Sequence, residues 1–334
     1  TTPLQLHMAV TERCNLRCEM CEFGQLKGDP DHVGYERLRD TLFQTAAIGI
    51  PSVNITGGEP LVYPKIYEIL ADAREAGLHC QLGTNGLLLR DKVLSRIAKT
   101  GVRQLSISLD GATAEVHDQI RGVSGGFQKS VDAAIRARQQ GFSVTISSVI
   151  MPSNISELIP LAKLARKHDF KISYPPVYYR NRALRRYAKH KQSEVATEQP
   201  QTWARTIPVL RDHQLEELEE VTNQLALLKK DGFPIKDSYT FLQRIPDYFK
   251  GIPPSKCNAG RDTISVQANG DVYSCWYMEP CGNVVQNTLA EILGGIEYRN
   301  RLGEIRECSQ RCMTNCYYHD SFFTKMRDKV HDMI

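Results

Sequence analysis

Residues 5–21 read QLHMAVTERCNLRCEMC. The stretch begins with a short apolar run, Leu6–Val10, and continues into three cysteines, Cys14, Cys18 and Cys21. An apolar run of this length is typical of a buried strand. The three cysteines are therefore expected in the loop that follows a strand. In parallel sheets, the chemistry lies at that end of the strands.

The same alternation of short apolar runs and amphipathic stretches continues to about residue 174. The expected strands are Leu6–Val10, Ser52–Ile55, His79–Leu82, Gln104–Leu109, Ser143–Ile150 and Lys171–Tyr174. The expected helices are Tyr35–Ala47, Lys65–Glu75, Asp91–Lys99, Gln128–Gln139 and Ile155–Lys167, with a further helix at Gln214–Lys230. Strands that alternate with helices predict an α/β fold with a parallel sheet and right-handed crossovers.

The composition is that of an ordinary globular protein. Of 334 residues, 41% are hydrophobic and 24% are charged, which excludes a disordered or collagen-like chain. No run of 18 apolar residues is present, so no membrane span is expected, and the start of the chain lacks a signal-peptide pattern. A net charge of +4 is too small to indicate nucleic-acid binding. We expect a cytoplasmic protein.

Ten cysteines indicate metal sites. Disulfide frameworks belong to small secreted domains, whereas this chain is long and carries no secretion signal. Three thiolates in residues 14–21 can hold three corners of an iron–sulfur cube, leaving one metal position open. His7 and His32 are conceivable fourth ligands, although His7 fits a residue on the sheet face better.

The spacing Cys14-x3-Cys18-x2-Cys21 after the first strand resembles the radical S-adenosylmethionine (SAM) superfamily, as does Gly57-Gly58-Glu59-Pro60 after the second. The resemblance implies a partial (βα)6 TIM-like barrel. It also implies that the three cysteines hold a [4Fe–4S] cluster whose open iron binds SAM. Reduction of the cluster would release a 5′-deoxyadenosyl radical that abstracts hydrogen from a substrate. A flavodoxin or ferredoxin is the expected reductant.

The same resemblance implies a set of SAM-binding residues. Gly57, Gly58 and Glu59 would bind the ammonium, and Arg121 the carboxylate, which suits its guanidinium fork. The other candidates are Asn85, Ser108 and Asp110 at strand ends and, near adenine, Met20 and Val149. Ordinary turn chemistry is the alternative for the strand-end residues, and core packing is the alternative for Val149.

A second group of cysteines follows residue 250. Asn269-Gly270-Asp271 predicts a hairpin that brings Cys257 and Cys275 together. Further candidate ligands are Cys308, Cys312 and Cys316. This arrangement resembles the twitch or SPASM auxiliary-cluster extension of the same superfamily. Six cysteines are too few for two fully ligated clusters, so one auxiliary [4Fe–4S] cluster is expected. A structural zinc ribbon is the alternative.

The expected organisation has three parts. Residues 1–176 would form the barrel core, 177–252 a bridging helical segment, and 253–334 a small cysteine-rich hairpin and helix domain. The basic stretch Arg180–Lys191 is either a solvated helix face or a clamp for an anionic substrate. Cys80 lies within an expected strand, where packing is the simpler interpretation.

Cys281 stands apart from the other cysteines. It could be a cluster ligand, a packed thiol or a hydrogen-atom donor, as in radical epimerases of the family. With a donor, epimerisation of a small molecule such as a sugar or aminocyclitol is the first hypothesis, ahead of dehydrogenation or dehydration.

Two alternatives to a small-molecule enzyme remain. One is a peptide-modifying maturase. Such enzymes often carry a leader-binding domain, and the ends of this sequence offer little room for one, which counts against this alternative. The other is a zinc-stapled binding protein without catalysis.

Overall fold

The computed structural model describes residues 2–21, 23–25, 32–177, 210–253, 257–309 and 312–313. The basic stretch 180–191 and Cys316 lie outside these ranges. The strands are β1 (Gln5–Ala9), β2 (Ser52–Thr56), β3 (His79–Thr84), β4 (Gln104–Ser108), β5 (Ser143–Ser147), β6 (Lys171–Ser173), β7 (Thr263–Val266), β8 (Asp271–Tyr273) and β9 (Gly282–Asn283).

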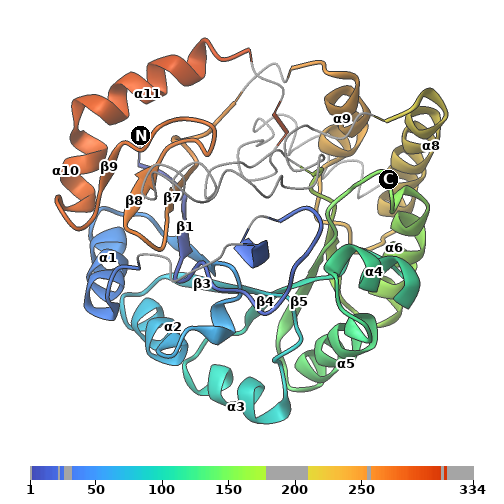
Figure 1. The fold of residues 1–334 in the computed structure, drawn as a ribbon, viewed down its shortest axis with the longest axis horizontal. Helices are drawn as coiled ribbons and strands as arrows, with labels where there is room; N and C mark the ends of the chain where they lie inside the picture. Colours follow the sequence, from blue (N-terminus) through green and yellow to red (C-terminus); the bar gives the residue numbers. More distant parts are fainter. Residues whose placement is uncertain are drawn as a thin grey trace.

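The described strands form a single sheet in the order β6-β5-β4-β3-β2-β1-β7-β8-β9. Strands β1 to β6 are parallel, as predicted. Strand β7 joins β1 in parallel, whereas β8 and β9 add antiparallel pairs. The strands curve into an arc that is not closed (Figure 1), which confirms the expected partial barrel with a small module appended to β1.

Helices cover the outside of the arc (Figure 1). They are α1 (Tyr35–Ala47), α2 (Ile66–Glu75), α3 (Asp91–Lys99), α4 (Ala114–Arg121), α5 (Gly126–Gln139) and α6 (Leu158–Lys167), with α8 (Asp212–Lys230), α9 (Tyr239–Lys250), α10 (Leu289–Gly294) and α11 (Ile296–Arg306) further along the chain. Short 3-10 turns occur at η1 (Phe23–Gln25), η2 (Pro60–Val62) and η3 (Ile155–Glu157). None of the described helices combines the length and apolarity needed to cross a bilayer.

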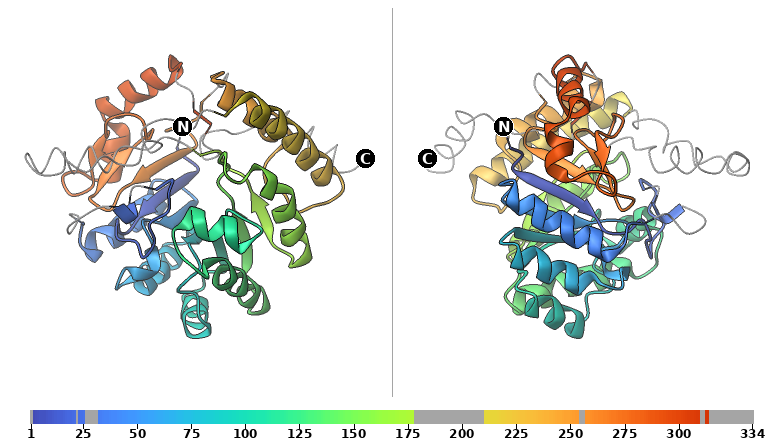
Figure 2. Two further views of the ribbon diagram at one scale, coloured as in Figure 1. Left: turned by 45° about the vertical axis from the view of Figure 1, so that its right-hand side comes forward. Right: turned by 90° about the vertical axis from the view of Figure 1, so that its left-hand side faces the viewer.

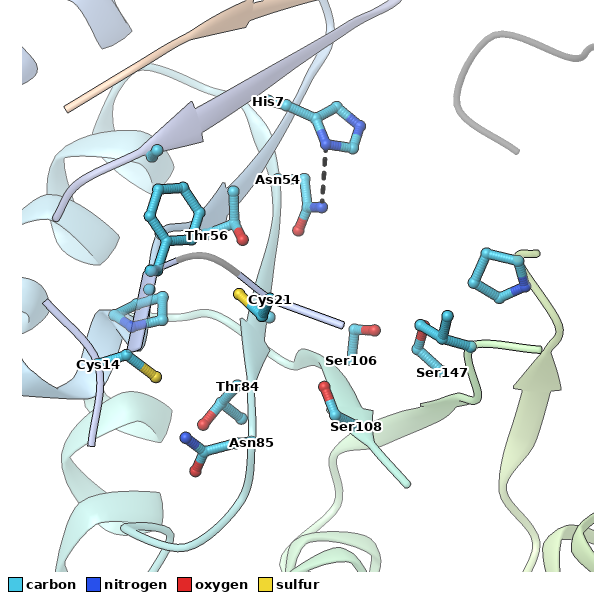
Figure 3. A pocket seen from close by; sticks show the side chains of 18 of the residues that line it. His7, Cys14, Cys21, Asn54, Thr56, Thr84, Asn85, Ser106, Ser108 and Ser147 are labelled. Atoms are coloured by element: carbon cyan, nitrogen blue, oxygen red, sulfur yellow. Dashed lines mark hydrogen bonds between the residues drawn. The ribbon is translucent and has the colours of Figure 1, made fainter. Parts of the chain in front are cut away.

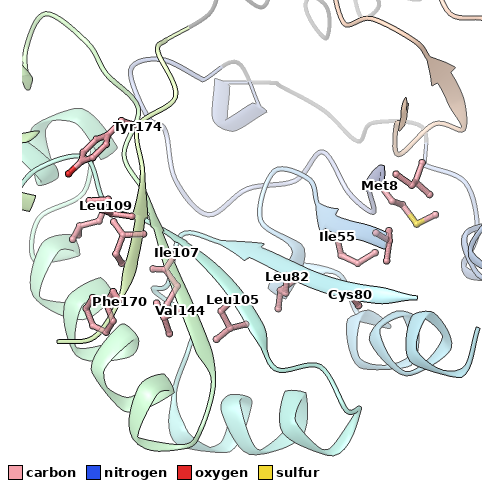
Figure 4. Packing of buried hydrophobic residues seen from close by; sticks show 14 of the residues in the cluster. Met8, Ile55, Cys80, Leu82, Leu105, Ile107, Leu109, Val144, Phe170 and Tyr174 are labelled. Atoms are coloured by element: carbon pink, nitrogen blue, oxygen red, sulfur yellow. The ribbon is translucent and has the colours of Figure 1, made fainter. Parts of the chain in front are cut away.

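The parallel strands have one apolar and one polar face. The outward side chains, such as Met8, Ile55 and Leu82, are fully buried against the helices (Figure 4). Cys80 belongs to this outer layer, which confirms a packing role. The inward side chains are mostly small and polar, for example Thr56 and Ser106. The inside of the arc is therefore a hydrophilic space, in contrast to parallel sheets that are covered on both faces and built from continuous apolar runs.

Strand β5 is shorter than predicted. It ends at Ser147, although the apolar sequence continues to Ile150. The backbone amide of Val149 donates to the Asp110 carboxylate at 2.8 Å, so it is not available to a ladder. Ile150 instead forms an isolated bridge with Pro176.

A short segment extends the sheet beyond β6. Ile235 pairs with Ile172 in parallel, with the Ile172 amide donating to Pro234 at 2.9 Å and the Lys236 amide donating to Ile172 at 2.8 Å. Asp237 holds this segment in place by accepting from the Ser173 hydroxyl and the Tyr174 amide, both buried. Helices α8 and α9 flank this end of the sheet, while α10 and α11 flank the other (Figure 2).

Candidate active site and metal centres

A cavity of about 500 Å³ lies on the inner side of the arc. Strand residues such as His7, Asn54 and Ser147 line it (Figure 3). Cys14, Cys18 and Cys21 also line it. Cys14 and Cys21 project into it from the loop after β1 (Figure 3). The topology thus brings this loop to the carboxyl ends of the parallel strands, as predicted.

The three cysteines differ in exposure. Cys18 is buried, and Cys14 and Cys21 are partly exposed. Burial, with smaller contributions from the nearby Cys21 and Cys18, raises the pKa of the Cys14 thiol to about 12. The Leu16 amide points at the Cys14 sulfur at 3.4 Å and opposes this rise. The three thiols form a soft, sulfur-rich donor set that faces the cavity.

The glycine pair packs against the cysteine loop. The Gly58 amide donates to the Thr11 carbonyl at 2.8 Å, and the Glu59 amide donates to the Arg13 carbonyl at 2.9 Å. A Cβ on Gly57 would lie 2.4 Å from the Thr11 oxygen, and one on Gly58 would lie 2.3 Å from the Arg13 oxygen. We expected these glycines to admit a ligand. The structure also shows that they let two loops of the chain meet.

Glu59 is completely buried. Its carboxylate accepts from the Thr84 hydroxyl at 2.8 Å, the Asn85 amide at 2.8 Å and the Leu61 amide at 3.1 Å. Burial raises the pKa of the Glu59 carboxyl, and these three donors oppose the rise. Because Asn85 lines the cavity and Glu59 lies behind it, the two predicted residues belong to one network.

Asp110 and Arg121 form a buried ion pair. The Arg121 Nη2 lies 2.6 Å from Asp110 Oδ2, and its Nη1 points at the Cys18 sulfur at 3.7 Å. Burial lowers the pKa of Arg121, but Asp110 and Cys18 more than offset this, so the pKa lies above its ordinary value. Arg121 lines the cavity, whereas Asp110 is fully enclosed.

His117 also belongs to this network, although it was not among the predicted site residues. Its Nδ1 faces the Asp110 amide at 3.2 Å, and burial, aided by Arg121, lowers its pKa to about 4. The imidazole is therefore neutral and accepts this hydrogen bond. Its position one helical turn before the predicted residue Arg121 was the available signal.

The remaining SAM-site candidates divide into two groups. Ser108 and Val149 line the cavity, together with Gly57 and Gly58. Met20 is partly buried against the main core and is not among the lining residues. His32, a conceivable metal ligand, instead accepts from the Glu12 amide at 3.0 Å.

Several lining residues had no predicted role in SAM binding, and three of them are His7, Trp276 and Lys236. His7 projects inward beside Asn54, with its Nδ1 3.4 Å from the Asn54 amide nitrogen (Figure 3). Trp276 meets the His7 ring edge-on at 6.2 Å and donates to Ser265 at 2.7 Å. Lys236 reaches the cavity from the segment beyond β6. These positions depend on strand register and on the appended module, which no short motif reveals.

The second group of cysteines also gathers. Burial raises the pKa of Cys257 to about 11 and that of Cys275 to about 12, with further contributions from Cys308 and Cys312. Backbone amides point at the Cys257 and Cys275 sulfurs at 3.5 and 3.4 Å, as at Cys14. Trp276 follows Cys275 directly, so this group lies next to the cavity wall.

Cys281 lies elsewhere. It is 7% exposed, packs in the main core, and contacts the Ser274 hydroxyl at 3.6 Å. It is not among the described residues that line the cavity.

Both groups fit iron–sulfur clusters in their donor chemistry. Among the described residues, no three potential ligands converge as a single metal ion would require. In a cubane cluster each thiolate binds its own iron, so the ligands stand further apart. The first group offers three thiols and an adjoining cavity.

The sequence matches two family profiles. The radical SAM superfamily profile matches residues 8–165, and an iron–sulfur cluster-binding domain named SPASM matches residues 257–317. The chain thus carries a radical SAM domain followed by a SPASM domain. Its cofactors are therefore [4Fe–4S] clusters and SAM, and the predicted cluster ligands Cys14, Cys18 and Cys21 line the cavity.

Curated relatives match to different extents. An AdoMet-dependent heme synthase of Methanosarcina barkeri is 31% identical over 49% of this chain and 48% of its own length. A second, from Oleidesulfovibrio alaskensis, is 27% identical over 93% of this chain and 79% of its own. The mycofactocin maturase MftC of Mycobacterium tuberculosis is 30% identical over 82% and 64%. The chain thus spans about half of the first relative and under two thirds of the maturase.

Solved structures share the fold. SuiB of Streptococcus suis, bound to S-adenosylmethionine, aligns with a TM-score of 0.68 at 18% identity, covering 96% of this chain and 76% of SuiB. The enzyme anSMEcpe with bound AdoMet aligns with a TM-score of 0.65 at 18% identity, covering 99% and 96%. At such identities the similarity concerns the fold.

Proposed function

We propose that the chain is a radical SAM enzyme that modifies a peptide. The observation that carries this proposal is the match to peptide-acting relatives over both modules. Besides the mycofactocin maturase, the PqqA peptide cyclase of Rhodopseudomonas palustris is 26% identical over 96% of this chain and 81% of its own length. These relatives favour a peptide substrate over the small molecule first expected. The cysteine and glycine motifs could not decide between the two, because they specify the cofactor rather than the substrate.

The site residues have distinct roles in this proposal. Cys14, Cys18 and Cys21 hold the first cluster, and Cys257, Cys275, Cys308 and Cys312 are the described candidates for the auxiliary cluster. When bound and reduced, the first cluster with SAM supplies the 5′-deoxyadenosyl radical that removes a substrate hydrogen. Asn85, Ser108, Val149 and Arg121 surround the space for SAM. Glu59 and Asp110 hold Asn85 and Arg121 in place from behind.

The lining of the cavity supports a substrate rich in amides. Its inward side chains include Asn54, Gln81, Gln267, Ser106 and Thr145. Amides and hydroxyls both donate and accept hydrogen bonds, so they can pair with peptide N–H and C=O groups. The strands hold these groups in fixed positions around the substrate, which is the part of the reaction that the protein supplies to the cofactor.

A test uses the reconstituted enzyme with SAM, dithionite and synthetic peptides encoded by short reading frames beside its gene. We expect 5′-deoxyadenosine formation to rise with one peptide, and that peptide to change mass. Controls are the same peptides with Cys18→Ala. If no peptide raises the rate while another class of compound does, the proposal is wrong.

A second candidate is oxidation of a small molecule. The Oleidesulfovibrio alaskensis relative named as an AdoMet-dependent heme synthase also matches over both modules. The same assay should therefore include iron porphyrins with carboxylate side chains, as well as sugars and aminocyclitols. Turnover of a porphyrin without turnover of any peptide would select this candidate.

Epimerisation with Cys281 as hydrogen donor stays a prediction. Its burial in the core and absence from the described cavity lining favour a packing role. Cys281→Ala tests this directly, since a packing residue permits correct product, whereas loss of product with intact clusters and hydrogen abstraction would restore the donor role.

A further inference from the structure

Lys236 occupies a defined position in the sheet. Ile235 is the partner of Ile172, so the next residues along the two segments, Lys236 and Ser173, stand side by side. Ser173 is in turn the register partner of Ser147 on β5. All three side chains line the cavity. They form one row that ends in an ammonium group, called here the Lys236 row.

The charges around the cavity are unbalanced. Its described lining contains the cations Arg121 and Lys236 but no aspartate or glutamate. The acids that lie behind this lining, Glu59, Asp110 and Asp237, are buried. Arg121 already pairs with Asp110 and contacts Cys18.

Lys236 has no such partner. Its Nζ makes no hydrogen bond or ion pair with any residue that the structure describes, and its side chain is open to the cavity. The adjacent Asp237 is buried and committed to Ser173 and Tyr174. Burial lowers the pKa of Lys236, Asp237 opposes this, and Lys171 adds to it, so a bound anion would stabilise the ammonium.

We propose that the Lys236 row binds a carboxylate group of the substrate. The ammonium supplies the charge, and Ser147, which has no other assigned role, supplies a hydroxyl donor. The site therefore selects a substrate with an acidic group, such as a peptide with a glutamate, aspartate or terminal carboxylate. This inference rests on the proposed function for the kind of substrate, but not for the existence of the anion site.

The test compares two probes of nearly equal shape, N-acetyl-L-glutamate α-amide and N-acetyl-L-glutamine α-amide, on the reconstituted enzyme with SAM. Both α-carboxylates are blocked as amides, so the probes differ only in the side-chain carboxylate. Hydrogen bonds to charged groups contribute about 1.5–3 kcal/mol, so we expect the carboxylate to bind about tenfold tighter or more. Lys236→Gln should abolish this preference, and Lys236→Arg should retain most of it. Lys163→Gln is the matched control, because Lys163 is exposed on α6 and does not line the cavity. Iron content and circular dichroism verify folding.

SAM also has a carboxylate, so its binding is measured separately by equilibrium dialysis. We expect Lys236→Gln to leave the dissociation constant of SAM unchanged. An equal loss for SAM would assign Lys236 to the cofactor and overturn the proposal, as would equal binding of the two probes by the unaltered enzyme. Neither result depends on turnover of a peptide, so failure of the peptide assay is a separate outcome.

Discussion

Gly57 and Gly58 illustrate how much a single side chain can decide in this protein. Both positions face backbone oxygens of the cysteine loop at distances that exclude a Cβ. Their contribution is to let the loop after β2, which carries Glu59, pack directly against the loop after β1, which carries Cys14. The motif therefore supports the first cluster site sterically as well as by any contact with SAM.

Gly58→Ala should destabilise the protein. The new methyl would lie 2.3 Å from the Arg13 carbonyl oxygen, and overpacking of this kind costs about 1–3 kcal/mol. Urea unfolding measures the loss, and iron content should fall with it. Gly303→Ala is the control, because Gly303 lies exposed within α11 and has nothing within 4 Å of the new methyl. That change should be neutral or stabilise by about 0.4–1 kcal/mol. Equal effects would contradict the steric argument.

His117 should make the stability depend on pH. Its pKa is lowered from 6.5 to about 4 in the folded protein, so below pH 6.5 the unfolded chain takes up the proton first. The free energy of unfolding should thus decrease from pH 6.5 to pH 4, by about 3 kcal/mol in total. His117→Asn, whose Oδ1 can accept the Asp110 amide, should remove this part of the pH dependence. The exposed His213→Asn serves as control, and an unchanged pH profile for His117→Asn would be inconsistent with a buried neutral imidazole.

The strands show how one element serves two purposes. On β4, Leu105 and Ile107 face the helices while Ser106 and Ser108 face the cavity. The period of two separates the apolar contacts that stabilise the fold from the polar groups that meet ligands. The segment beyond β6 follows the same rule, with Ile235 buried and Lys236 inward.

Neighbouring substitutions on β4 should separate these two purposes. Ile107→Ala should cost about 2–5 kcal/mol, because Ile107 is fully buried. Ser106→Ala should change the free energy of unfolding by less than about 0.5 kcal/mol, yet alter substrate affinity. Chemical unfolding and substrate titration measure the two effects. A large loss of stability in Ser106→Ala would contradict the assignment of the two faces.

For the protein as a whole, the two cysteine groups are separate in sequence but belong to one continuous sheet. Strand β7 pairs with β1, so the module that carries Cys257 and Cys275 is continuous with the sheet that carries the first group. Trp276 of this module lines the same cavity as His7 of β1. A substrate in the cavity would thus contact both modules.

Cys18→Ala and Cys275→Ala should affect different clusters. The unaltered protein should be brown and contain about eight irons if both clusters are cubanes, and each variant should retain about four. Cys18→Ala should abolish SAM cleavage, whereas Cys275→Ala should permit it and impair the complete reaction. Iron and sulfide analysis with 5′-deoxyadenosine assays measures this. A colourless zinc protein, or unchanged cleavage in Cys18→Ala, would show that the first site is wrongly assigned.

Much of the fold could be predicted because the signals for helices and strands lie within short segments of the sequence. Helices α1 and α3 have the predicted bounds, since amphipathic periodicity is contained in each segment. Helices α4, α9, α10 and α11 were not predicted. The predicted end of β5 at Ile150 was also wrong, because the Val149 amide donates to the carboxylate of Asp110, which is distant in sequence.

The sequence by itself determined the chemistry: three cysteines at fixed spacing and a glycine pair followed by glutamate specify cofactor type, since soft thiolates and small residues have few substitutes. Only the tertiary structure decided which side chains share the cavity. Lys236, Trp276 and His7 are far apart along the chain and meet through strand register, and register depends on the packing of the whole sheet. For the same reason, only the fold showed that Cys281 lies in the core while Arg121 pairs with Asp110 beside Cys18.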